Sequence, residues 1–101
     1  MKPVRHQYAD EAKRDLANIR AYLKEHAGGA VAAQMISRLR AAIASARSMP
    51  RAGVAKPEYR PNCRFVLENP YVIYYDFDGE LLLVLRVVHH ARDRDALMSG
   101  G

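Results

Sequence analysis

The stretch YVIYYDFDGELLLVLRVV, residues 71–88, carries the strongest local structural signal in the sequence. Residues 71–77 are rich in β-branched and aromatic side chains, which strands prefer. Asp78-Gly79 then predicts a two-residue hairpin turn, because such turns need positive φ values. Residues 81–88 return as a strand that is apolar on both faces except at Arg86. We therefore expect one face of this strand to pack on helices. Its other face either belongs to a near-central strand or binds a partner.

A third strand precedes this hairpin. Residues 63–68 are strand-like, and Asn69-Pro70 predicts the turn that leads into residues 71–77. Together the three segments predict an antiparallel meander. Residues 50–62 carry Pro or Gly at short intervals, so we expect a loop without a regular element there. These breakers are Pro50, Gly53, Pro57 and Pro61.

Two amphipathic helices are predicted before that loop, joined by Gly28-Gly29. Asp10 is expected to cap the first helix, and Asp15 to fall on its surface with the other charged side chains. Pro50 ends the second helix. The apolar positions, at steps of three and four residues, are Ala12, Leu16, Ile19 and Leu23, then Ala32, Met35, Ile36, Leu39, Ala42, Ile43 and Ala46.

These elements predict an α+β fold. Residues 4–8 alternate apolar and polar side chains, as a short N-terminal strand does. The helices would form an antiparallel hairpin packed on a mostly antiparallel sheet that ends in the three-stranded meander. We expect a single domain over residues 1–101, with frayed ends at 1–3 and 96–101.

Composition favours a cytoplasmic protein. The lone cysteine, Cys63, cannot form an internal disulfide, which favours a reducing compartment. Residues 1–8 lack the apolar run of a signal peptide, and the longest apolar run, residues 81–85, is too short to span a bilayer. We therefore expect no membrane association.

Positive charge is concentrated in the middle of the chain. The net charge is +5, yet residues 27–64 carry seven Lys or Arg and one acidic residue, Glu58. Residues 65–101 carry three basic and six acidic residues. This asymmetry indicates an acidic partner, either nucleic acid or protein. A solvated helix face followed by a basic loop also explains it, and composition alone favours that simpler interpretation.

The sequence offers no motif for a cofactor or a metal. It has no glycine-rich phosphate loop, no Cys-x-x-Cys pair and no nucleophile elbow. His89 and His90 are adjacent, so in an extended segment their side chains point to opposite sides, which is poor geometry for one ion. We expect no cofactor and no metal.

Metal-free RNA cleavage remains an alternative from the residues alone. It needs an acid, a base and cations on the phosphate. Arg64, Arg86 and Arg92 offer the charge, and His89 or His90 offers a group that titrates near neutrality. In the other interpretation, Arg86 pairs with Asp93 or another carboxylate, and the histidines cap the end of the strand.

Several motifs, in this order, resemble the ParE-type toxins of the RelE/ParE superfamily. Asp15-Leu16 with Ile19 and Tyr22 is similar to the first-helix pattern of that family, and Pro50-x-x-Gly53 to the motif after its second helix. Residues 71–75 resemble its Tyr-[Val/Leu]-Ile-[Phe/Tyr]-Tyr strand. The closing motif, Arg-Val-Leu-His-x-x-Arg-Asp, is similar to residues 86–93. The resemblance spans residues 4–95.

The resemblance implies the toxin of a type II toxin–antitoxin system, neutralised by a co-encoded ParD-like antitoxin. Such an antitoxin binds operator DNA and wraps the toxin with its C-terminal part, so the toxin meets DNA only indirectly. The usual target is DNA gyrase, inhibited by binding. RelE-like endoribonucleases, which cleave mRNA, carry a catalytic tyrosine, histidine or basic residues after the last strand. No tyrosine follows Tyr75 here, so we expect a non-enzymatic inhibitor. A degenerate toxin that only modulates its antitoxin is a third possibility.

The resemblance also suggests contact residues. The predicted target-binding residues are Arg60, Arg64, Arg86, His89, Arg92 and Asp93. The ribonuclease alternative would use Arg64, Arg86, His89 and His90. The predicted antitoxin contacts are Leu16, Ile19, Tyr22, Leu23, Ile36, Leu39, Leu83 and Leu85. All eight also fit an interior role, above all Leu16, Ile19 and Leu39.

Overall fold

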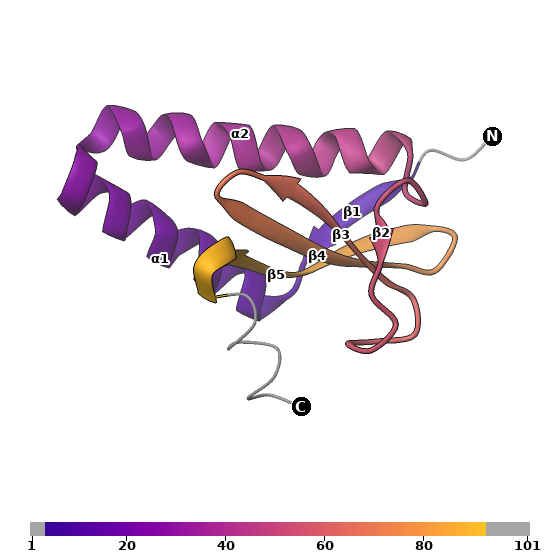
Figure 1. Cartoon of the computed structure of the whole chain (residues 1–101). Helices are drawn as coiled ribbons and strands as arrows, with labels where there is room; N and C mark the ends of the chain where they lie inside the picture. The colour runs from indigo at the N-terminus through magenta and orange to yellow at the C-terminus, as the bar shows by residue number, and fades with distance from the viewer. Residues whose placement is uncertain (1–3, 93–101) are drawn as a thin grey trace.

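The computed structural model describes residues 4–92. The predicted fraying of residues 1–3 and 96–101 therefore concerns positions outside the described residues. Two helices follow a short first strand, and four further strands and a helical turn at residues 90–92 come after them (Figure 1). In chain order the elements are β1 (Arg5–Tyr8), α1 (Asp10–Ala27), α2 (Gly29–Ser48), β2 (Val54–Ala55), β3 (Cys63–Glu68), β4 (Tyr71–Phe77) and β5 (Leu81–His89).

The strands form one sheet in the order β1-β5-β4-β3-β2. β3, β4 and β5 make the predicted antiparallel meander, and β1 joins its end by pairing in parallel with β5. β5 therefore has a strand on each side, and its apolar side chains join a buried cluster on each face of the sheet. The expectation of a mostly antiparallel sheet is confirmed.

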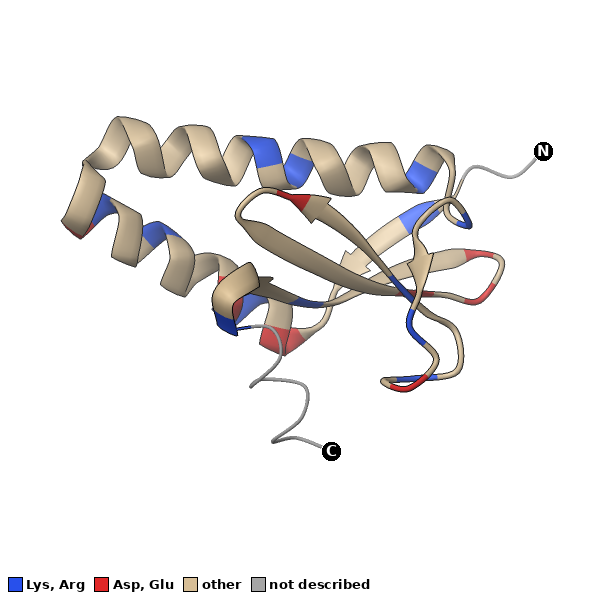
Figure 2. Ribbon diagram, in the orientation of Figure 1, with Lys and Arg blue, Asp and Glu red and all other residues tan. Residues whose placement is uncertain are grey.

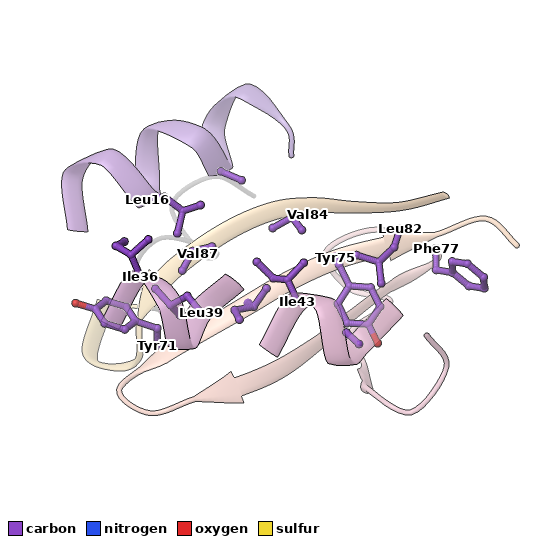
Figure 3. Close-up of a cluster of buried hydrophobic side chains, with 13 residues drawn as sticks. Leu16, Ile36, Leu39, Ile43, Tyr71, Tyr75, Phe77, Leu82, Val84 and Val87 are labelled. Carbon is purple, nitrogen blue, oxygen red and sulfur yellow. The ribbon is translucent and has the colours of Figure 1, made fainter. Parts of the chain in front are cut away.

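The helical hairpin covers one face of this sheet, and the main core lies between them (Figure 3). Leu39 and Ile43 of α2 are 0% and 1% exposed, and they pack with Tyr75 of β4. Leu16 of α1 packs with Val87 of β5 in the same cluster. Each fully buried side chain of this kind contributes about 1.5–3 kcal/mol by leaving water.

The opposite face of the sheet carries a smaller cluster of buried side chains. Its members are Cys63, Val72, Tyr74, Leu85 and Val88. No helix of the described chain covers this face. Tyr59, from the segment before β3, packs its ring edge-on against Tyr74, with 5.7 Å between the ring centroids.

The helix ends differ from the sequence prediction in two places. Asp10 does not cap α1, because Ala9 holds the N-cap position and no side chain bonds there. Asp10 is the first helical residue, where a negative charge still interacts favourably with the helix dipole. The link between the helices is Gly28 alone, at φ +96°, and Gly29 already belongs to α2.

Two predictions about connections are also wrong in detail. The segment 50–62 is not entirely loop, because Val54–Ala55 forms β2, which pairs with Phe65 and Arg64 at the edge of the sheet. The hairpin between β4 and β5 turns around Gly79 at φ +106°, and Asp78 keeps a negative φ. Its carboxylate instead accepts hydrogen bonds from the backbone N–H groups of Glu80 and Leu81, both at 2.9 Å.

Candidate functional site

An ion pair joins α1 to β5 just beyond the end of β1. Asp15 Oδ2 accepts hydrogen bonds from Arg86 Nε at 2.7 Å and from the Val87 backbone N–H at 2.9 Å. Arg86 Nη2 donates to Asp15 Oδ1 at 3.1 Å. β1 ends at Tyr8, opposite Val84, so Asp15 supplies the acceptor that a longer β1 would have offered. The hydrogen bond to Asp15 raises the pKa of Arg86 and keeps its charge fixed.

A β-bulge in β5 places Arg86 at this junction. Tyr74 pairs with Arg86 while its neighbour Tyr75 pairs with Val84, so Leu85 is the extra residue. Val84 and Val87, three residues apart, consequently both join the core on the helix side. Strict alternation along the strand would have sent Val87 to the opposite face. The sequence interpretation in which Arg86 pairs with a carboxylate is therefore correct, but its partner is Asp15.

Arg60, just before β3, and Arg64, within β3, lie at a different end of the sheet from the Asp15–Arg86 ion pair. Arg64 Nη1 donates a hydrogen bond to the Gly53 backbone carbonyl at 2.8 Å, which ties β3 to the segment that follows α2. Arg60 is exposed, and its carbonyl accepts a hydrogen bond from the Cys63 N–H at 3.0 Å. Arg64 therefore makes a structural contact, whereas the Arg60 side chain lies at the surface.

The histidines and Arg92 lie at the end of β5. His89 packs edge-on against Tyr71, with 5.5 Å between the ring centroids, and its Nδ1 accepts a hydrogen bond from the Ala91 N–H at 3.1 Å. The His90 N–H donates to the Pro70 carbonyl at 2.7 Å. His89, His90 and Arg92 are all exposed. Asp93 lies outside the described residues.

The structure does not bring the ribonuclease candidates together. Arg64 lies opposite Tyr75 on β4, whereas His89 lies opposite Tyr71, four positions along the same strand. That separation amounts to about 13 Å along the strands. Arg86 lies between them but is held by Asp15. Arg64 and Arg86 are thus engaged in structural contacts and are not gathered with the histidines around one site.

Ionisable groups in the described chain offer little other chemistry. Across residues 4–92, no three His, Cys, Asp or Glu side chains lie close enough to hold a metal ion. Burial, with a smaller contribution from Asp76, raises the pKa of the Cys63 thiol to about 11, so it stays protonated near neutral pH. No helix within residues 4–92 is long and apolar enough to cross a membrane.

Two open grooves border α2. One, of about 600 Å³, lies between α2 and β3, and its lining includes Ala42, Met49 and Leu67. Met49 and Leu67 are 67% and 63% exposed. A hydrogen-bonded ion pair, Arg38 Nη2 to Glu68 Oε2 at 2.7 Å, crosses its rim. The second groove, of about 460 Å³, lies between the two helices.

Residues 7–94 match the family described as the ParE toxin of the type II toxin–antitoxin system, parDE. The chain belongs to the ParE toxin family. A solved structure of the chromosomal ParDE system from P. aeruginosa contains a similar chain, with a TM-score of 0.74 and 18% identity over 86% of this chain and 96% of that chain. At 18% identity this similarity shows that the two chains share a fold. No curated protein matches the sequence.

The predicted antitoxin contacts of this ParE-family toxin divide into three groups. Four of the eight are interior, which corrects the idea that they form a contact surface: Leu16, Ile36, Leu39 and Leu85 are all 7% exposed or less. Ile19, Leu23 and Leu83 are half-buried. Tyr22 is 54% exposed and stacks on His26, with 4.1 Å between the ring centroids.

Sequence reasoning missed the role of Asp15 and the exposed apolar residues of the α2–β3 groove. Asp15 was expected at the surface, but its side chain is only 13% exposed. Its position directly beside Leu16, at the border of the apolar stripe, was the available signal. Met49 and Leu67 gave no sequence signal of their exposure, because an isolated apolar residue at a helix end or on a strand is usually expected in the core.

Proposed function

We propose that this ParE-family toxin acts by binding DNA gyrase and is neutralised by a co-encoded ParD-like antitoxin. The main support for inhibition by binding, rather than by RNA cleavage, is that the candidate catalytic side chains are dispersed. Arg86 is committed to Asp15, Arg64 to the Gly53 carbonyl, and His89 lies at the far end of the strands. Acid–base cleavage of RNA needs these groups around one phosphate.

The target contact is proposed at exposed polar side chains. His89 and Arg92 lie together at the end of β5, and Arg60 is exposed before β3. Asp93, which follows Arg92 directly, completes this set. Arg64 and Arg86 would support the surface through the contacts that hold their strands. Exposed charges of this kind set the specificity and the rate of association more than raw affinity.

The antitoxin is proposed to cover apolar surface that the toxin leaves open. Tyr22 is the most exposed of the residues suggested for this role, and Leu83 is half-buried. The groove beside Met49 and Leu67 adds exposed apolar surface along α2 and the edge of β3. Surface of this type is typical of a protein interface. The name of the P. aeruginosa system, ParDE, supports a two-component arrangement for this chain.

The deciding experiment is a supercoiling assay with purified gyrase, run beside RNA cleavage with the same preparation. We expect loss of supercoiling or trapped cleaved DNA, with intact RNA. The double substitution His89→Ala and Arg92→Ala should weaken inhibition about tenfold, the effect of losing one or two interface contacts. The matched control, Lys13→Ala with Arg14→Ala, removes exposed charge from α1 and should inhibit normally.

Cut RNA with unaffected gyrase would overturn the proposal. In that case Arg86, His89 and His90 become the residues to substitute, because the ribonuclease alternative assigns them the chemistry. The antitoxin is tested separately by adding the product of the neighbouring reading frame, which should restore supercoiling at a one-to-one ratio.

A further inference from the structure

A row of basic side chains runs along the helical hairpin. Arg20 and Lys24 of α1 lie across from Arg40 of α2, because all three border the same shallow depression between the helices. Arg47 comes seven residues after Arg40, so it projects from the same side of α2, about 10 Å further along the helix. All four residues are exposed. We call Arg20, Lys24, Arg40 and Arg47 the cationic row.

β1 positions the α2 half of this row. The Arg40 guanidinium carbon lies over the Tyr8 ring, 5.9 Å from its centroid, and Arg47 Nη1 lies 3.4 Å from His6 Nδ1. The His6 and Tyr8 rings pack edge to face, with 5.7 Å between their centroids. Burial, and then the nearby Arg47, lower the pKa of His6, so this ring is neutral near pH 7. The two guanidinium groups are therefore placed beside β1 while both keep their charge.

Within residues 4–92, no carboxylate forms an ion pair with the cationic row. The ion pairs of this part of the chain use Arg38, Lys56 and Arg86 instead. Arg38 leaves α2 on the side of β3, where it pairs with Glu68. α2 has no acidic residue from Gly29 to Ser48, and Figure 2 shows blue but no red positions along it. The row is therefore a concentration of positive charge that its own surroundings leave uncompensated.

The charges of α1 lie on two sides of the helix. Because an α-helix turns about 100° per residue, Glu11, Asp15 and Glu25 project from one side of α1. Arg20 and Lys24 project from the opposite side, which borders α2. The position of Asp15 agrees with this division, since its carboxylate bonds to β5. These three carboxylates of α1 consequently face away from the cationic row.

We propose that the cationic row binds the phosphate backbone of double-stranded DNA. DNA carries one charge about every 3.4 Å along each strand, so Arg40 and Arg47 would meet phosphates about three apart. Arg20 and Lys24 would meet phosphates beside them from α1. The choice of DNA rests on the proposed function, since DNA is the substrate of gyrase. The proposal replaces the expectation that the toxin meets DNA only through its antitoxin.

A phosphate backbone fits the row better than a protein does. Protein interfaces need apolar anchors near their centre. Val31 and Met49 are exposed, but they lie on the side of α2 opposite to Arg40. Val54 and Leu67 are exposed on β2 and β3, at the other edge of the sheet from β1. The row therefore offers charge without an apolar centre, which suits a phosphate backbone.

A duplex also fits the row better than a single strand does. Proteins bind single strands by stacking bases on exposed aromatic rings. Tyr8 is half-buried, and the Arg40 guanidinium lies over its ring. Tyr22 is exposed, but it lies on the side of α1 opposite to Arg20. No exposed ring of residues 4–92 therefore lies along the row to receive a base.

The test is fluorescence anisotropy with the full-length protein and a short fluorescein-labelled DNA duplex of mixed sequence. Four phosphate contacts predict that log Kd rises with log salt concentration with a slope of about 3.6. R20Q/R40Q/R47Q should weaken binding at least tenfold at low salt and lower the slope to about 1. The matched control R14Q/R60Q/R92Q removes three exposed arginines outside the row and should change the affinity less than threefold. Circular dichroism checks that each variant is folded.

A charge-preserving variant separates loss of charge from local damage to the hairpin. R20K/R40K/R47K should bind the duplex within threefold of the parent, because lysine meets a phosphate as a point charge. Equal losses in the two glutamine variants, or an unchanged salt slope in R20Q/R40Q/R47Q, would overturn the proposal. So would tighter binding of single-stranded DNA or of a glutamate-rich peptide, since either outcome assigns the row to another ligand.

The binding measurement does not involve gyrase. DNA binding through the row by a protein that leaves supercoiling unaffected would overturn the proposed function and keep the DNA site. Inhibition of gyrase by a protein that does not bind the duplex on its own would overturn the DNA site and keep the proposed function. The two proposals therefore fail in different assays.

Discussion

The two faces of the sheet are covered in different ways. On one face, α1 and α2 shield a large cluster that includes Leu39, Ile43 and Tyr75. On the other, the smaller cluster around Tyr74 and Leu85 has only the segment before β3 over part of it. The hairpin therefore supplies most of the burial that stabilises the fold. The second face adds less because its buried cluster is smaller.

Truncating one leucine on each face tests this comparison most strongly. Leu39→Ala removes a side chain that is 0% exposed and should lower the free energy of unfolding by roughly 2–5 kcal/mol. Leu83→Ala, on the second face, should cost about 1 kcal/mol because Leu83 is half-buried. Urea denaturation measures both. Equal costs would show that the two faces stabilise the fold equally.

The helix side also carries a polar connection, which the next substitution removes. Asp15→Ala leaves Arg86 and the Val87 N–H without their acceptor and should lower the free energy of unfolding by about 2 kcal/mol. Asp15→Asn keeps one acceptor and should lose about half as much. A thermal melt in which both variants match the parent would mean that apolar packing alone joins α1 to β5.

The close packing of Gly53 against Tyr75, beside the core on the helix side, gives a smaller effect. A Cβ added at Gly53 would overlap the Tyr75 hydroxyl and lie 3.0 Å from the Phe65 carbonyl oxygen, so Gly53→Ala should cost about 1–2 kcal/mol. Gly29 has nothing within 4 Å of the same position. Gly29→Ala should therefore stabilise by about 0.5 kcal/mol, because it restricts the unfolded chain. Chemical denaturation of the two variants measures both changes in the free energy of unfolding. A Gly53→Ala variant as stable as the parent would show that Tyr75 can move away from the added methyl group at little cost.

The last effect appears only at alkaline pH and concerns the closure of the second face around Cys63. Burial raises the pKa of its thiol from 9.0 to about 11. The unfolded thiol ionises first as the pH rises, so this contribution to stability is complete below about pH 9 and is lost towards pH 11. Cys63→Ala should flatten the alkaline part of the stability profile. Iodoacetamide at pH 8 should modify the native thiol far more slowly than the urea-unfolded one; similar rates would show that this face is open.

The elements with local signals were predictable from the sequence. Residues 71–88 form two paired strands because their side chains and a glycine turn favour a hairpin without help from distant residues. The helices follow from their apolar spacing. The predicted two-residue turn, Asp78-Gly79, was one residue too short. The Asp78 carboxylate, rather than a positive φ at Asp78, holds the chain reversal.

The candidate site was less predictable, because its contacts join residues far apart in the chain. Arg86 was singled out, but its partner Asp15 lies on another element and was assigned to the surface. The bulge at Leu85 that aims Arg86 depends on register with Tyr74, which no local pattern encodes. β2 exists only because Val54 and Ala55 pair with β3.

The amino-acid sequence predicts the helical hairpin, the meander, the basic middle of the chain and the motifs of the ParE family without knowledge of distant contacts. Each depends on short-range propensity, hydrophobic period or composition. Tertiary structure alone decided that β1 lies parallel beside β5, that Asp15 completes the strand edge, and that Arg20, Lys24 and Arg40 face one groove. Those features come from contacts whose free energy exists only once distant segments have packed together.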